Sequence, residues 1–324
     1  MTNRQTTNRV KAVTGLGPDA IPTARQDEDT SKRAAEVRLG DVLLSLGSGP
    51  LSRAIALFDG GEVSHAALAL GEGQLAEATD GGLRRCSITA SAAEHERMVA
   101  RRLSAEADTT PVADVARRYL DAGGDYAYQQ IVLLAVLAGT RRAPLPASGR
   151  RLLRAVLDQA AGALNTMLEH GRTLMICSEF VYRCHHEARP AAPYVLDVGG
   201  REPDDGSVLD WALDRDTLPS VVPPRGNPVD LGPLVAEYAA DSGLGLPAAP
   251  LRPSTGSGAP ADDEDLLRSL VGFGSALGAA TGTSAGDRPR DGLEAIRAYA
   301  ADPNFVTPGD LARTASLTDR VHIL

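Results

Sequence analysis

Residues 174–182 read LMICSEFVY. The apolar start of this stretch predicts a short buried strand, and a helix is expected from Cys177 to about residue 188, before Pro190. Cys177 then lies in the first turn of the helix, where unpaired backbone N–H groups and the helix dipole favour a negative charge. A thiol there has a lowered pKa, so Cys177 is a candidate nucleophile. The alternative is a small buried side chain without chemical function.

A nucleophilic cysteine needs a base, and His65 has the most informative position among the six histidines. It lies inside the apolar run 63–68, VSHAAL, which predicts a strand. A buried imidazole needs a hydrogen-bond partner or a function, so His65 is either the base or a structural histidine. His95 is expected in a charged loop, whereas His185 and His186 are expected on the surface of the cysteine helix.

Glu77 is the candidate for a third member, on the strand expected after the turn at 71–73. If Leu70 pairs with Gln74 across a three-residue loop, Glu77 lies opposite residue 67 and on the same sheet face as His65. A carboxylate there would orient the imidazole. A two-residue loop would reverse the parity and place Glu77 on the opposite face. A solvated strand glutamate is the alternative.

The remaining patterns predict an α+β fold. Strands are expected at 42–46, 63–70, 74–79, 83–88 and 98–103. Helices are expected at 51–58, 111–122 with Thr110 as its cap, 125–138, 150–169, 263–280, 293–301 and from Thr307-Pro308-Gly309-Asp310 into 311–317.

Composition suggests where the chain is unstructured. Residues 1–35 are polar and lack periodicity, which predicts a disordered tail. Residues 223–260 are rich in Pro, Gly, Ala and Ser, which predicts linker or irregular structure. We expect an insert with helices at 222–302, either a loose surface segment or a region that docks a partner.

Charge and cysteine content exclude several classes of protein. The formal net charge is −9 and no basic run with interleaved aromatics is present, so nucleic acid is a poor candidate partner. Three cysteines do not build a disulfide framework and fit a reducing compartment. The apolar run 131–138 is too short to span a bilayer, and the N-terminus has no apolar signal region. A cytoplasmic protein without an integral membrane segment is expected, with signal-less export left open.

Several motifs occur together in a particular order. They are GDVLL at 40–44, VSHAAL at 63–68, AEAT at 76–79 followed by Gly81-Gly82-Leu83, CSEFVY at 177–182 and VTPGDLAR at 306–313. This order resembles the circularly permuted branch of the NlpC-type papain-like superfamily, in which the histidine strand precedes the cysteine helix. The resemblance covers roughly residues 37–200 and 303–324.

The resemblance implies a permuted papain-like domain at 36–221, closed by residues 303–324, with an antiparallel sheet packed against the cysteine helix. It implies a catalytic site of Cys177, His65 and Glu77, and places Tyr126 near the substrate.

Relatives cleave amide or peptide bonds, often in cell-wall peptides or amino-acylated lipids, and some transfer acyl groups. The expected function is a cysteine hydrolase (amidase or peptidase) acting on a small-molecule or peptide substrate, without metal or cofactor. An acyltransferase or thioesterase with the same site, and a catalytically silent binding module, are the alternatives. The long segments at about 140–172 and 222–300 depart from the simplest relatives.

Overall fold

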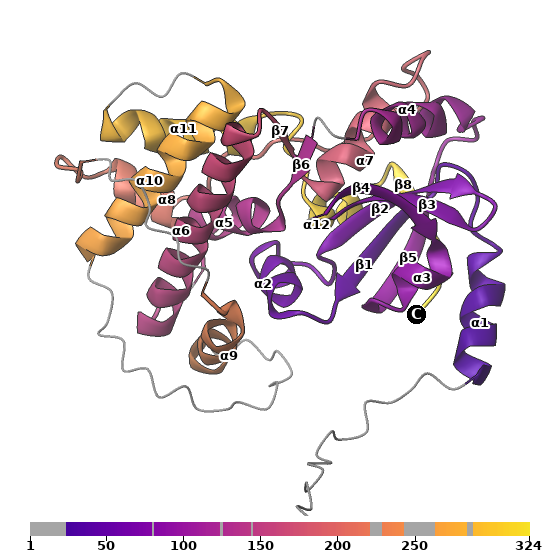
Figure 1. Cartoon of the computed structure of the whole chain (residues 1–324), viewed down its shortest axis with the longest axis horizontal. Coiled ribbons are helices and arrows are strands. Elements are labelled where there is room, and N and C mark those ends of the chain that lie inside the picture. Colours follow the sequence, from indigo (N-terminus) through magenta and orange to yellow (C-terminus); the bar gives the residue numbers. More distant parts are fainter. Residues whose placement is uncertain are drawn as a thin grey trace, which may run out of the picture.

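A six-stranded antiparallel sheet and a separate group of helices form the two sides of the computed structural model (Figure 1). The structure describes residues 24–79, 81–123, 126–143, 145–220, 229–242, 263–283 and 288–324, with side chains except at 24–27 and 126–128. An α+β fold is therefore confirmed, with an antiparallel sheet.

The sheet has the strand order β4-β3-β2-β1-β5-β8. Its strands are β1 (Val42–Gly47), β2 (His65–Gly71), β3 (Gln74–Thr79), β4 (Gly82–Ser87), β5 (His95–Leu103) and β8 (Leu317–His322). The central strands β1 and β2 are buried almost throughout. They are apolar at successive positions because helices cover both faces of the sheet.

Alternate residues of β1 show how the two faces are covered. Val42 and Leu44 belong to a core shared with α4 (Thr110–Asp121) and α7 (Cys177–His186). Leu43 belongs to the opposite core, which includes residues from α1 (Ala24–Ala34) and α3 (Ile88–Ala92). The cysteine-bearing helix α7 thus packs on one face, against β2 and β3.

The helical group has its own core. It is built by α2 (Pro50–Phe58), α5 (Gln130–Thr140), α6 (Ala147–Glu169), α8 (Val208–Leu213), α9 (Leu231–Ser242), α10 (Asp263–Thr281) and α11 (Pro289–Ala301). Every residue of α5 from Val132 to Thr140 is buried. The apolar run at 131–138 is therefore explained by a helix enclosed on all sides.

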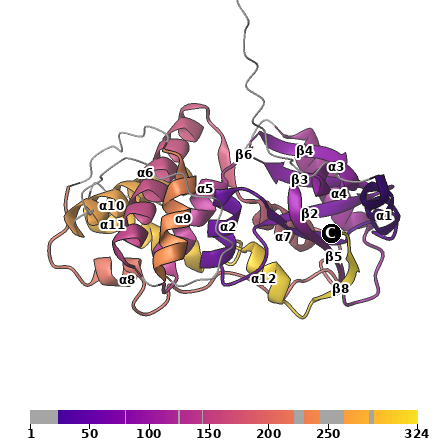
Figure 2. The same cartoon turned by 90° about the horizontal axis from the view of Figure 1, so that it is seen from below.

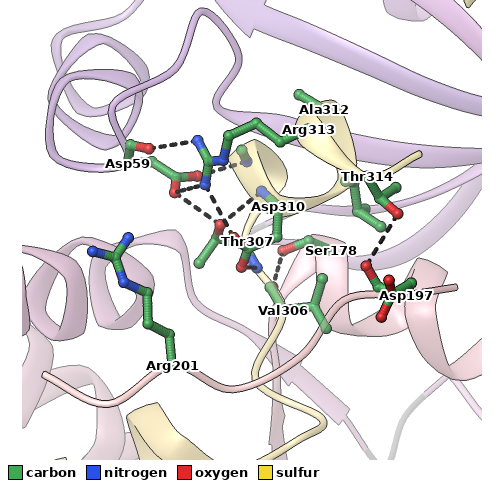
Figure 3. Close-up of polar contacts among 12 residues, drawn as sticks. Asp59, Ser178, Asp197, Arg201, Val306, Thr307, Asp310, Ala312, Arg313 and Thr314 are labelled. Atoms are coloured by element: carbon green, nitrogen blue, oxygen red, sulfur yellow. Dashed lines mark hydrogen bonds and ion pairs between the residues drawn. The ribbon is translucent and has the colours of Figure 1, made fainter. Parts of the chain in front are cut away.

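The C-terminal segment joins the two sides of the molecule. In both views α12 (Pro308–Arg313) lies between the helical group and the sheet (Figures 1 and 2). The buried carboxylate of Asp59, just after α2, accepts hydrogen bonds from Thr307 Oγ1 at 2.8 Å and Gly309 N at 2.6 Å (Figure 3). Arg313 also donates to the carbonyl oxygen of Asp59 at 2.9 Å. This contact fixes the start of α12 before the chain enters β8.

Several expectations about individual elements were wrong. Residues 24–34 of the expected tail form α1, while residues 1–23 lie outside the described part. The helix expected at 125–138 begins only at Gln130, because residues 126–128 form β6, which pairs in parallel with β7 (Thr173–Met175). The helix expected to run to residue 317 ends at Arg313, and the sixth strand follows.

The N-cap of α4 and the structure of the expected insert also differ from expectation. Thr109, not Thr110, is the N-cap residue of α4, and the Thr110 hydroxyl donates to Asp108 instead. Within the expected linker, residues 231–242 form α9, whereas 221–228 and 243–262 lie outside the described residues. The described helices at 222–302 supply side chains to the core around α5 and α6, so they are not a loose surface segment.

Candidate active site

Helix α7 presents Cys177 at its first position, directly after the short strand β7. Ile176 is the N-cap residue, and its N–H donates to Glu179 Oε2 at 3.4 Å. The Ser178 hydroxyl donates to the carbonyl oxygen of Val306 at 2.6 Å, which ties the first turn of α7 to the C-terminal segment (Figure 3). The helix start, and with it the thiol, is therefore held from two directions.

The Cys177 thiol lies against the beginning of β2. Burial alone would raise the pKa of this thiol, because a thiolate is poorly solvated there. The charge of His65 and a hydrogen bond from it, together with the backbone N–H groups of Ala66 and Ser178, outweigh burial and hold the pKa below its usual value. Cys177 therefore loses its proton more readily than an ordinary cysteine does.

His65 responds in the opposite direction. Burial disfavours its positive charge, but the Cys177 thiolate and then the Glu77 carboxylate outweigh burial and raise the pKa of His65. Cys177 is 2% exposed and His65 is 4% exposed, so little water screens the two charges. The arrangement favours a thiolate–imidazolium pair.

The two ring nitrogens of His65 have different surroundings. Nε2 lies 3.2 Å from Glu77 Oε2. Nδ1 is buried and makes no hydrogen bond of regular geometry with the part of the chain that the structure describes. Because Nε2 is engaged by Glu77, Nδ1 is the ring nitrogen left to interact with the Cys177 thiol.

The Glu77 carboxylate is fully buried and contacts four side chains. Oε2 faces His65 and accepts from Ser91 Oγ at 3.1 Å. Oε1 accepts from Arg84 Nε at 2.8 Å and from Cys86 Sγ at 3.2 Å. Burial would raise the pKa of this carboxyl, but His65 foremost, with Cys86 and Arg84, holds it well below its usual range. Glu77 is therefore a fixed negative charge.

Glu77 lies on the expected face of the sheet, but the loop that precedes its strand has a different length from the expected one. Residue 67 pairs with Glu77 as expected. However, Gln74 pairs with Gly71 rather than Leu70, so the loop has two residues, both with positive φ: Glu72 (52°) and Gly73 (70°). A bulge between Ala69 and Gly71 adds one residue to β2 and restores the parity that a two-residue loop would have reversed.

Several residues that contribute to the site were missed in the sequence, His95 among them. His95 is the first residue of β5, not part of a loop, and its ring stacks on His65 at a centroid distance of 5.7 Å and an angle of 19°. Its Nδ1 lies 2.7 Å from the carbonyl oxygen of Ser91, the residue whose hydroxyl holds Glu77. Burial, and to a lesser extent the charge of His65, lowers the pKa of His95. A ring that resists protonation therefore lies against His65.

Arg84 is the contributor for which the sequence did carry a signal. In the hairpin of β3 and β4, Arg84 pairs directly with Glu77. Opposite charges at paired positions of two adjacent strands are a recognisable pattern. The turn between these strands was not assigned from the sequence, so the pairing could not be read from it.

The other two cysteines differ from Cys177. Burial and the neighbouring Glu77 raise the pKa of Cys86 to about 12. Burial raises the pKa of Cys184 well above its usual value. Cys177 is thus the one cysteine of the three with a lowered pKa.

The remaining expected positions are the two adjacent histidines of α7 and Tyr126. His185 is buried rather than on the surface, and burial lowers its pKa to about 4, whereas His186 is exposed as expected. The backbone of Tyr126 lies on β6 and pairs with Thr173 of β7. Strand β7 is the one that leads to Cys177. The side chain of Tyr126 lies outside the described atoms, so its expected contact with substrate stays a prediction.

The described residues contain neither a helix that could span a membrane nor a metal-binding cluster. None of the described helices combines the length and apolar character needed to cross a bilayer. Among these same residues, no three or more His, Cys, Asp or Glu side chains are grouped so that they could hold a metal ion.

The chain was also compared with known proteins. No family model matches it, and no curated protein or solved structure is significantly similar to it.

Proposed function

We propose that this protein is a cysteine-dependent hydrolase of amide or related acyl bonds, working through an acyl-cysteine. The observation that carries the proposal is the buried Cys177–His65–Glu77 arrangement, in which each neighbour favours the charged form of the next. The order of elements along the chain also supports a permuted papain-like architecture. The strand bearing His65 precedes the helix bearing Cys177 and packs against it.

The reaction follows from the positions of these groups. The Cys177 thiolate attacks the carbonyl carbon of the substrate, forming the C–S bond, while backbone N–H groups at the start of α7 stabilise the oxyanion. His65 then donates its Nδ1 proton to the leaving amine as the C–N bond breaks. Glu77 holds the imidazole by Nε2 throughout. Water attacks the acyl-cysteine with His65 as the base, and the carboxylic acid and free thiol are regenerated.

The test is to trap the intermediate. The full chain is mixed with p-nitrophenyl acetate, quenched in acid and analysed by intact-mass and peptide mass spectrometry. We expect a burst of nitrophenol, one acetyl group on Cys177 and its loss with time. The burst and label should vanish in Cys177→Ala and fall strongly in His65→Ala. Cys184→Ala, on the same helix, should behave as wild type.

Each other outcome has a definite meaning. An acetyl group that leaves Cys177 only when an amine or alcohol acceptor is added would replace hydrolysis by acyl transfer on the same site. Acetylation spread over several residues, or unchanged in His65→Ala, would contradict the proposal and favour a non-catalytic binding module.

A further inference from the structure

Arg141 is a buried charge for which the described chain offers no direct partner. It follows the last residue of α5 and is 7% exposed. Its Nη1 is inaccessible and has no hydrogen-bond partner among the described residues, and no ion pair to Arg141 occurs among them. A guanidinium is costly to bury without a counter-charge or hydrogen-bond acceptor, so this position calls for an explanation.

A second arginine is fixed beside it. The 201–204 segment is tied to the end of α5, because Asp204 N donates to Thr140 O at 2.8 Å and Arg142 N donates to Asp204 Oδ2 at 3.0 Å. Arg201 N donates to the carbonyl oxygen of Ala300 at 3.0 Å. These contacts bring the 201–204 segment against the end of α5. Burial foremost, then the like charge of Arg201, lowers the pKa of Arg141.

The 201–204 segment follows a close backbone contact with the end of α11. Gly200 packs so tightly that a Cβ atom there would overlap the carbonyl oxygens of Ala301 and Asp302. Arg201 itself extends from this segment toward the group around Asp59 and Thr307 (Figure 3). The backbone of Arg201 is thus held by the packing of its segment, and its guanidinium is held by the ion pair with Asp204.

The nearby aspartates are already engaged with other groups. Asp204 binds Arg201 at 2.5 Å, and Asp310 binds Arg313 at 3.0 Å. Asp59 accepts from Thr307, Gly309 and Arg313. These carboxylates balance the overall charge at a distance, but none of them contacts Arg141. A direct acceptor for Arg141 is what the described chain does not supply.

We propose that Arg141 and Arg201 form a binding site for a small anion with a carboxylate or phosphate group. The planar guanidinium fork matches both groups because each presents two oxygens to parallel N–H donors. The shared chemistry is an oxyanion with at least two accessible oxygens. The site is independent of Cys177 and would exist whether or not the proposed hydrolase function is correct.

The test measures anion-dependent stability of the full chain at constant ionic strength. Sodium phosphate or sodium acetate replaces sodium chloride in thermal unfolding and in isothermal titration calorimetry. We expect a saturable rise in Tm and measurable heat of binding for wild type. Arg141→Met should weaken binding at least tenfold and should raise Tm in chloride alone, because an unpaired buried charge has been removed. Arg201→Gln, a change at an exposed side chain, should weaken binding while leaving Tm in chloride nearly unchanged.

Arg142→Gln is the matched control, since it removes the same charge from an exposed neighbour. It should keep the wild-type response. A response to phosphate alone assigns the site to tetrahedral anions, and a response to both anions assigns it to oxyanions generally. The proposal is overturned if wild type responds to neither anion, or if Arg141→Met and Arg201→Gln respond as wild type does. A lower Tm of Arg141→Met in chloride, with no anion response in wild type, would assign Arg141 a purely structural contact.

Discussion

Among single residues, the buried Glu77 carboxylate adds to the effect of Cys177 in raising the pKa of His65. The carboxylate is fully buried, yet its pKa is low because His65, Cys86 and Arg84 all stabilise the anion. Ser91 links this carboxylate to the stacked ring of His95 through one hydrogen bond to each. The orientation of the imidazole is thus set by Glu77, which contacts it directly, and by Ser91, which holds Glu77.

Glu77→Gln tests this charge directly. The amide keeps the size of the side chain but removes its charge, so the pKa of His65 should fall and the imidazolium should be lost at a lower pH than in wild type. Acylation of Cys177 by p-nitrophenyl acetate should drop on the order of 100-fold near neutral pH, and the alkaline limb of its pH profile should move to lower pH. Glu94→Gln removes the other carboxylate of Arg84 without touching His65 and should keep the wild-type profile. An unchanged profile in Glu77→Gln would show that the carboxylate has no part in the pair.

At the element scale, the helical group depends on a close crossing of α10 and α11. A Cβ atom on Gly274 would overlap the backbone of Gly292, the carbonyl oxygen above all. Both glycines are buried. The two helix backbones therefore approach each other more closely than side chains would allow, which makes the position intolerant of change.

Gly274→Ala should destabilise the protein by about 1–3 kcal/mol, because a backbone contact has to open. Gly162→Ala on α6 is the control, since its added methyl meets no atom within 4 Å. That change should stabilise by about 0.5–1 kcal/mol through helix propensity. Urea unfolding of both variants measures the difference. Equal stability of the two would mean that α10 and α11 do not cross as described.

The elements that could be predicted are those whose pattern is local. The strand with His65 and the helix with Cys177 follow from apolar runs and a helix start, and the hairpin from its Gly-Glu-Gly turn. The sixth strand, β8, is largely exposed and polar, LTDRVH, so its pairing with β5 carries no apolar alternation. The contacts of Ser91 and His95 depend on how α3 and β5 pack, and pairing between strands far apart in sequence has no local signal.

At the scale of the whole molecule, the candidate site lies where the cysteine helix meets the sheet, next to the segment that closes the fold. Ser178 bonds to Val306, and Asp59 bonds to Thr307, so residues 306 and 307 contact both α7 and the end of α2 (Figure 3). The helical group is thereby coupled to the first turn of the cysteine helix. The segments that the resemblance treated as inserts thus share one core with α2, α5 and α8, beside the proposed catalytic part.

The rate at which Cys177 is alkylated decides whether His65 keeps it a thiolate at neutral pH. Wild type and His65→Ala are treated with iodoacetamide between about pH 4 and pH 9, and each cysteine is followed by mass spectrometry. We expect Cys177 to react faster than Cys86 and Cys184 below pH 7. In His65→Ala the reaction at neutral pH should slow by about tenfold for each unit by which the thiol pKa rises. If Cys177 reacts only at alkaline pH and equally in both proteins, no thiolate–imidazolium pair exists and the proposed chemistry is wrong.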